Sequence, residues 1–125
     1  MEYVESFKDL EVYKLARQLS KKIFVLTKVF PKEEMYSLTD QIRRSSRSIG
    51  GQIAEGWGKR RYINHFISKM TDADGEQLET QHWIEVSFDC EYINVEKHNE
   101  LNNDCKAIGK MLNSMMNKAG DFCKK

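Results

Sequence analysis

The sequence has little of what sheet-rich, disulfide-bonded or membrane-spanning proteins need. It contains one proline, and its three cysteines, Cys90, Cys105 and Cys123, are odd in number and far apart. That spacing predicts reduced thiols rather than a disulfide framework or a cysteine metal site. No apolar run approaches the roughly 20 residues that cross a bilayer, and Met1–Glu5 lacks the pattern of a signal peptide. We therefore expect a cytoplasmic protein without a membrane partner.

Charge is abundant but unevenly distributed along the chain. Charged residues make up 31% of the sequence and hydrophobic residues 40%, which is typical of a soluble helical domain. The net charge is +1, yet residues 1–62 balance to +5 and residues 63–125 to −4. The two halves can pair within one chain, or they can offer complementary faces to neighbouring copies.

Apolar residues recur at helical spacing in four segments, which predict helices at about 9–30, 38–57, 62–92 and 96–119. The connections between them are short, and short connections favour antiparallel neighbours. We predict an all-α fold, an antiparallel up-down-up-down four-helix bundle, formed by a single domain over residues 1–125. The third apolar stripe is interrupted at Asp74–Gln77.

Small residues crowd the middle of the second predicted helix. A glycine inside a helix costs roughly 1 kcal/mol relative to alanine, so its presence there suggests that another backbone approaches closely. We predict close helix packing at four positions, and we expect a leucine in place of Gly51 to disrupt folding or assembly. The four positions are Ser48, Gly50, Gly51 and Ala54.

The same region carries a recognisable motif. Phe30-Pro31 is followed by Gln41-Ile42-Arg43-Arg44, then Ser48-Ile49, then Ile53-Ala54-Glu55-Gly56. The pattern resembles the four-helix bundle protein family, also called the 23S rRNA intervening-sequence protein family, with Gln52 in place of an asparagine. The likeness continues through Phe7–Ala16, Glu79–Ile84 and Asp89–Ile93, and so covers nearly the whole chain.

The resemblance implies a ring-shaped homopentamer whose biochemical activity is not established. A related branch, the accessory variability determinant of diversity-generating retroelements, forms a basic pentamer that binds RNA and a reverse transcriptase. The resemblance also suggests that Arg43 or Arg44 meets Glu76 or Glu79, inside one bundle or between bundles. A solvated surface, or contact with a ligand or nucleic acid, is the alternative for these four residues.

Lys59, Arg60 and Arg61 follow the second predicted helix, with Trp57 and Tyr62 on either side. Cations gather phosphate groups and aromatic rings stack on bases, so these residues, with Arg47, are candidates for nucleic-acid binding. Cations also favour a helix C-terminus for electrostatic reasons alone. The near-neutral chain argues against a general RNA-binding protein.

Two weak patterns point to catalysis or metal binding. Arg60 and His65 have the spacing of the arginine–histidine pair of HEPN ribonucleases, in which the arginine can stabilise a phosphorane-like transition state while the histidine moves the proton. Glu79 and His82 form half of a di-iron site, but no second Glu-x-x-His is present. We expect no metal, no cofactor and no enzymatic activity. The leading prediction is a homo-oligomeric scaffold or binding module, with RNA binding as the alternative.

Overall fold

The computed structural model describes residues 4–123, so Met1–Tyr3 and the last two residues of the predicted domain lie outside the described range. Four long helices dominate this part of the chain, and it contains no strand. The prediction of an all-α, four-helix bundle is confirmed. In chain order the elements are η1 (Phe7–Asp9), α1 (Glu11–Thr27), η2 (Lys32–Glu34), α2 (Leu38–Gly58), α3 (Ile63–Asp89), α4 (Val95–Asn117) and α5 (Ala119–Phe122).

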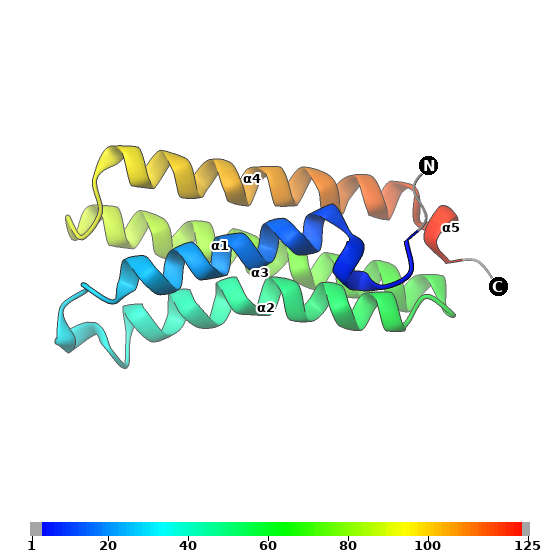
Figure 1. Ribbon diagram of the computed structural model, residues 1–125, viewed down its shortest axis with the longest axis horizontal. Coiled ribbons are helices and arrows are strands. Elements are labelled where there is room, and N and C mark those ends of the chain that lie inside the picture. Colours follow the sequence, from blue (N-terminus) through cyan, green and yellow to red (C-terminus); the bar gives the residue numbers. More distant parts are fainter. Residues whose placement is uncertain (1–3, 124–125) are drawn as a thin grey trace.

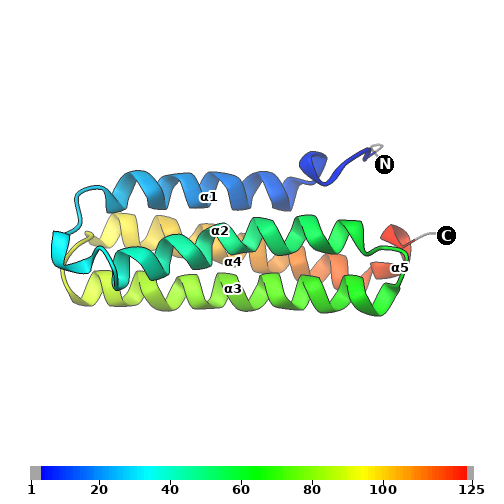
Figure 2. The ribbon, with the colours of Figure 1, turned by 90° about the horizontal axis from the view of Figure 1, so that it is seen from below.

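The four long helices lie side by side, and the chain reverses direction at each connection between them (Figure 1). Each helix contacts the next one in sequence, and α4 closes the bundle against α1. Within residues 4–123, no Cα atom of α1 lies within 8 Å of a Cα atom of α3. They occupy opposite corners of the bundle, with α2 and α4 between them (Figure 2).

The helix ends differ from the predicted ones for local reasons. α1 begins at Glu11 rather than at residue 9, because Leu10 has an extended backbone (φ −68°, ψ 132°). It ends at Thr27, three residues before the predicted end and shortly ahead of Pro31, which has no N–H to donate. α3 ends at Asp89, and Glu91 beyond it takes a positive φ of 61°, which ends helical geometry.

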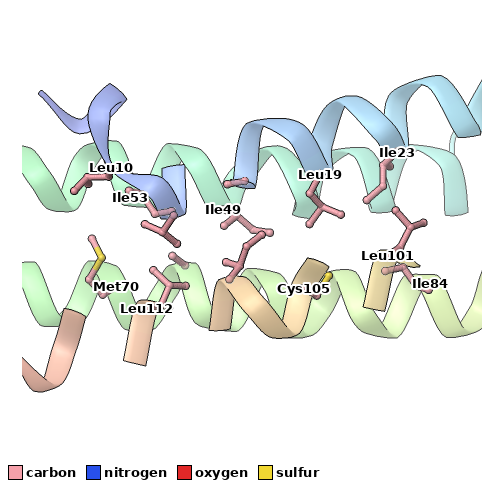
Figure 3. Close-up of a cluster of buried hydrophobic side chains, with 14 of the residues drawn as sticks. Leu10, Leu19, Ile23, Ile49, Ile53, Met70, Ile84, Leu101, Cys105 and Leu112 are labelled. Atoms are coloured by element: carbon pink, nitrogen blue, oxygen red, sulfur yellow. The ribbon is translucent and has the colours of Figure 1, made fainter. Parts of the chain in front are cut away.

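The apolar stripes of the helices meet in one continuous core (Figure 3). α3 also contributes buried polar residues, which explains the interruption of its stripe. Gln77 and Thr80 are buried, and the Thr80 hydroxyl lies 2.8 Å from that of Ser45 on α2. No helix within residues 4–123 combines the length and hydrophobicity needed to cross a membrane. The largest fully buried apolar side chains include Phe66, Leu19, Ile23, Ile42, Ile49, Ile53, Met70, Ile84, Leu101, Ile108 and Leu112.

Candidate functional site

The small residues of α2 lie on more than one face of the helix. Gly50 is buried, and a Cβ there would make ordinary contact with the Tyr13 ring at 3.5 Å. Gly51 is exposed, and a Cβ there would meet no atom within 4 Å. Ser48 and Ala54 are half-buried. Among residues 4–123 of one protomer, therefore, nothing packs closely on Gly51.

A close contact between α2 and α3 lies at a glycine outside the predicted set. A Cβ on Gly56 would collide with the Met70 methyl group and lie 3.0 Å from Lys69 Cβ. Gly109 marks a similar close contact between α4 and α3, because a Cβ there would lie 2.8 Å from Gln77 Nε2. Gly56 belongs to the Ile53-Ala54-Glu55-Gly56 motif, and that position was the one signal in the sequence for the contact between Gly56 and Met70.

The predicted arginine and glutamate residues do not pair within the described part of the protomer. Arg43 Nε donates to Thr27 Oγ1 at 2.8 Å, and Arg44 is exposed. Glu79 accepts a hydrogen bond from Trp83 Nε1 at 3.0 Å. No ion pair in residues 4–123 joins Arg43 or Arg44 to Glu76 or Glu79. Any such pairing would have to form between copies.

The carboxylates of α3 form an acidic face on that helix. α3 carries six Asp or Glu residues and one lysine, Lys69, which pairs with Glu55 of α2 at 2.7 Å. Asp72, Glu76 and Glu79 recur at helical spacing and so share a face. Partial burial raises the pKa of Glu76, and repulsion from Glu79 raises it further, although the Ser48 hydroxyl offsets part of the rise. None of the ion pairs in residues 4–123 includes Asp72, Glu76 or Glu79.

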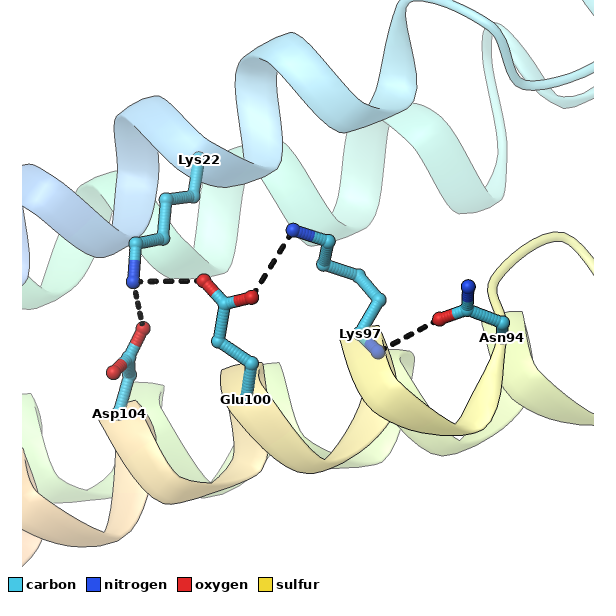
Figure 4. Close-up of polar contacts among 5 residues, drawn as sticks. All are labelled: Lys22, Asn94, Lys97, Glu100 and Asp104. Carbon is cyan, nitrogen blue, oxygen red and sulfur yellow. Dashed lines mark hydrogen bonds and ion pairs between the residues drawn. The ribbon is translucent and has the colours of Figure 1, made fainter.

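α1 carries the opposite charge. Lys14 pairs with Glu11 within the helix, and two lysines and one arginine remain without a carboxylate partner on α1. It has four Lys or Arg residues against one Glu. Lys22 alone reaches α4, where its Nζ lies 3.0 Å from Glu100 and 2.8 Å from Asp104 (Figure 4). Arg17 and Lys21 are exposed and make no ion pair within residues 4–123. The basic side of α1 therefore stays available to a partner.

Three cations gather around one phenyl ring between α1 and α2. Lys28 Nζ and Arg43 Cζ each lie 4.9 Å from the centroid of the Phe24 ring, and Arg47 Cζ lies 5.4 Å from it. Phe24 and Lys28 were not predicted as site residues. Phe24 and Lys28 are four residues apart, as are Arg43 and Arg47, so each pair shares one helix face. That spacing could indicate a cluster only once α1 and α2 were known to be adjacent.

The predicted nucleic-acid candidates fall into two separate places. Arg47 lies over the Phe24 ring. Lys59 follows the end of α2, about 18 Å further along the helix axis at 1.5 Å per residue. Arg60 stacks on Trp57 with its Cζ 3.6 Å from a ring centroid, and its Nε donates to the Trp57 carbonyl at 2.7 Å. Lys59 and Arg61 are exposed. The four residues do not form one surface.

A family model described as 23S rRNA-intervening sequence protein matches residues 8–114. The chain belongs to this family. A crystal structure of a protein of unknown function from the S23 ribosomal protein family of Bacteroides thetaiotaomicron is 31% identical to the chain. That match covers 85% of this chain and 95% of the other, with a TM-score of 0.76. No curated protein matches the chain.

In this member of the 23S rRNA-intervening sequence protein family, the glutamine at the asparagine position of the motif is engaged. Gln52 Oε1 accepts a hydrogen bond from Lys69 Nζ at 3.2 Å, which helps to join α2 to α3. The substitution therefore keeps an amide oxygen in use between the two helices.

The ribonuclease and metal patterns also have defined positions. Arg60 is held against Trp57, while His65 lies beside Tyr62 with ring centroids 5.3 Å apart. The His82 ring lies 4.6 Å from that of Trp83, the same side chain that donates to Glu79. Across residues 4–123, no three His, Cys, Asp or Glu side chains gather as metal ligands would.

Proposed function

We propose that this protein is a non-enzymatic scaffold that assembles with copies of itself, the basic side of α1 in one copy facing the acidic side of α3 in the next. One observation carries the proposal. The helix with a net charge of +3 and the helix with a net charge of −5 lie at opposite corners of the bundle. Two different, complementary surfaces on one molecule favour head-to-tail contacts, which close into a ring when the rotation permits.

The two charged helices cannot neutralise each other inside one protomer. α2 and α4 separate them, and the described ion pairs between helices instead join α1 to α4, α2 to α3 and α3 to α4. Exposed charges that lie more than about 8 Å apart are largely screened at physiological salt. A neighbouring copy is therefore the partner that brings the cations of α1 within reach of the α3 carboxylates.

Exposed glycines on the α2–α3 side support the same assembly. Gly51 of α2 and Gly75 of α3 lie inside long helices, and a Cβ at either position would meet no atom within 4 Å. Each costs about 1 kcal/mol relative to alanine. The described part of the protomer shows no compensating contact, whereas a helix of a neighbouring copy would pack closely on such positions. The family resemblance implies five copies in the ring.

Charge reversal tests this arrangement. One variant carries Arg17→Glu and Lys21→Glu on α1, and a second carries Asp72→Lys and Glu79→Lys on α3. All four side chains are exposed, so the bundle is expected to stay folded by circular dichroism. Each variant should lose assembly mass in light scattering, because like charges then face each other. A variant with all four changes should recover it, because every contact is again between opposite charges.

A matched control reverses two exposed lysines on α4, Lys106→Glu and Lys110→Glu, and should leave the mass unchanged. Retention of the full mass by the α1 variant would contradict the proposed interface. So would failure of the four-site variant to recover the assembly while remaining folded.

A further inference from the structure

We infer that Lys28, Arg43 and Arg47, gathered around Phe24, form a binding site for a phosphate group. The site lies where α1 ends and α2 begins, and it goes beyond the assembly proposed above. Each cation lies within 5.4 Å of the centroid of the same ring, so no two of these charges are more than about 10 Å apart. Such a distance is comparable to the Debye length, and mutual repulsion is therefore appreciable.

Within residues 4–123, no carboxylate lies within ion-pair distance of these cations. None of the ion pairs in residues 4–123 includes Lys28, Arg43 or Arg47. Glu34, on the short η2 helix nearby in sequence, is engaged by the hydroxyls of Ser37 and Tyr92 at 2.7 and 2.9 Å. The cations are attracted by the Phe24 ring, but a neutral ring does not cancel three positive charges.

Arg43 is held in place for binding. Thr27 is buried, donates its hydroxyl proton to the Ile23 carbonyl at 2.7 Å, and accepts from Arg43 Nε at 2.8 Å. The ring of Phe24 orients the same guanidinium. Both anchors leave the two terminal nitrogens of Arg43 without a partner among the described residues, and these nitrogens form the fork that binds phosphate oxygens in a bidentate manner.

The cluster opens on a pocket of about 350 Å³. Lys28, Lys32 and Arg43 line it, and so does Thr39 from the first turn of α2. Thr39 is only 3% exposed, and its hydroxyl oxygen has no hydrogen-bond partner among the described residues. An unpaired buried hydroxyl is unfavourable by about 1–3 kcal/mol. The pocket therefore brings an unpaired buried hydroxyl close to the cations, and a phosphate bound there would neutralise their charge.

A phosphate group fits the site better than a single carboxylate does. The pocket and the ring together present four cations, Lys28, Lys32, Arg43 and Arg47. A phosphate carries up to two negative charges and several acceptor oxygens, so it can accept from several of these donors at once. Its source is either a free phosphorylated molecule or the backbone of a nucleic acid, and both present the same group.

Thermal unfolding in inorganic phosphate, at constant ionic strength maintained with sodium chloride, tests the site. Phosphate should raise the melting temperature in a saturable manner, because a ligand that binds only the folded state stabilises it. Arg43→Gln should weaken the apparent affinity about tenfold or more, the loss expected for a charge-assisted hydrogen-bond pair. Lys28→Gln provides a second variant in case Arg43→Gln unfolds. Arg61→Gln is the control, since it removes the same charge from an exposed position on the α2–α3 turn.

A single-stranded oligoribonucleotide then distinguishes the two sources. Displacement of phosphate by the oligonucleotide, with both affinities weakened by Arg43→Gln, assigns the site to a nucleic-acid backbone. Phosphate binding without displacement assigns it to a free phosphorylated molecule. Equal weakening by Arg61→Gln and Arg43→Gln, or stabilisation that does not saturate, would show a general ionic effect and overturn the inference.

Discussion

Gly51 and Gly56 lie on the same helix, yet their substitutions should have opposite consequences. A side chain on Gly51 meets open space within the protomer. Leucine has nearly the helix propensity of alanine, so Gly51→Leu should stabilise the isolated bundle by about 0.5–1 kcal/mol. If a helix of the next copy packs on this position, the same side chain should prevent assembly. The expected variant is therefore a folded protein of reduced mass.

Gly56→Ala changes packing inside the protomer instead. The new methyl group would collide with the Met70 methyl and lie 3.0 Å from Lys69 Cβ, which belongs to the fixed base of its side chain. Overpacking of this kind costs about 1–3 kcal/mol, and the propensity gain of about 1 kcal/mol offsets only part of it. We expect a net loss of up to about 2 kcal/mol.

Urea unfolding followed by circular dichroism measures the stability of both variants, and light scattering measures their mass. Unfolding of Gly51→Leu would refute the finding that this position is open in the protomer. A folded Gly51→Leu protein with unchanged mass would refute close packing between copies there. Gly56→Ala should reduce stability without a selective effect on assembly, which separates the two kinds of contact.

The remaining predictions concern charge and thiol chemistry. Burial lowers the pKa of His98, but hydrogen bonds to Asn99 and to Glu85, at 2.6 Å, raise it overall, so the pair contributes stability at low pH and loses it as pH rises through the raised pKa. Glu85→Gln should therefore lower the melting temperature at pH 5.5 and have little effect at pH 8. Lys22→Met should cost less than about 1 kcal/mol, because its two carboxylate partners are partly exposed, and urea unfolding should show the difference shrinking in 1 M salt. Burial raises the pKa of Cys105 to about 12, so a thiol reagent at pH 8 should modify exposed Cys90 and leave Cys105 unmodified until the protein unfolds.

Much of the fold could be predicted from the sequence because helical periodicity is a local property. Residues such as Leu19 and Ile23 recur at the spacing that places them on one face, and both are fully buried. The helix ends were less predictable, since they depend on backbone conformations such as the positive φ of Glu91. The polar residues Gln77 and Thr80 hid the core face of α3, because their burial depends on partners from other parts of the chain.

The candidate sites were harder to predict because they depend on how the helices face one another. Gly56 follows Gly51 by five positions, a net rotation of about 140° at 3.6 residues per turn, so only one of them can face α3. Periodicity alone did not show which of the two glycines faces α3. Phe24 and Arg43 likewise come together through the register of α1 against α2, and no sequence spacing encodes that register.

Light scattering coupled to size exclusion, with absorbance recorded at protein and nucleic-acid wavelengths, tests the central proposal of self-assembly most directly. We expect a mass near five times that of the 14.7-kDa chain, decreasing as salt screens the contact between α1 and α3. A mass equal to one chain at every concentration and at low salt would contradict the proposed scaffold.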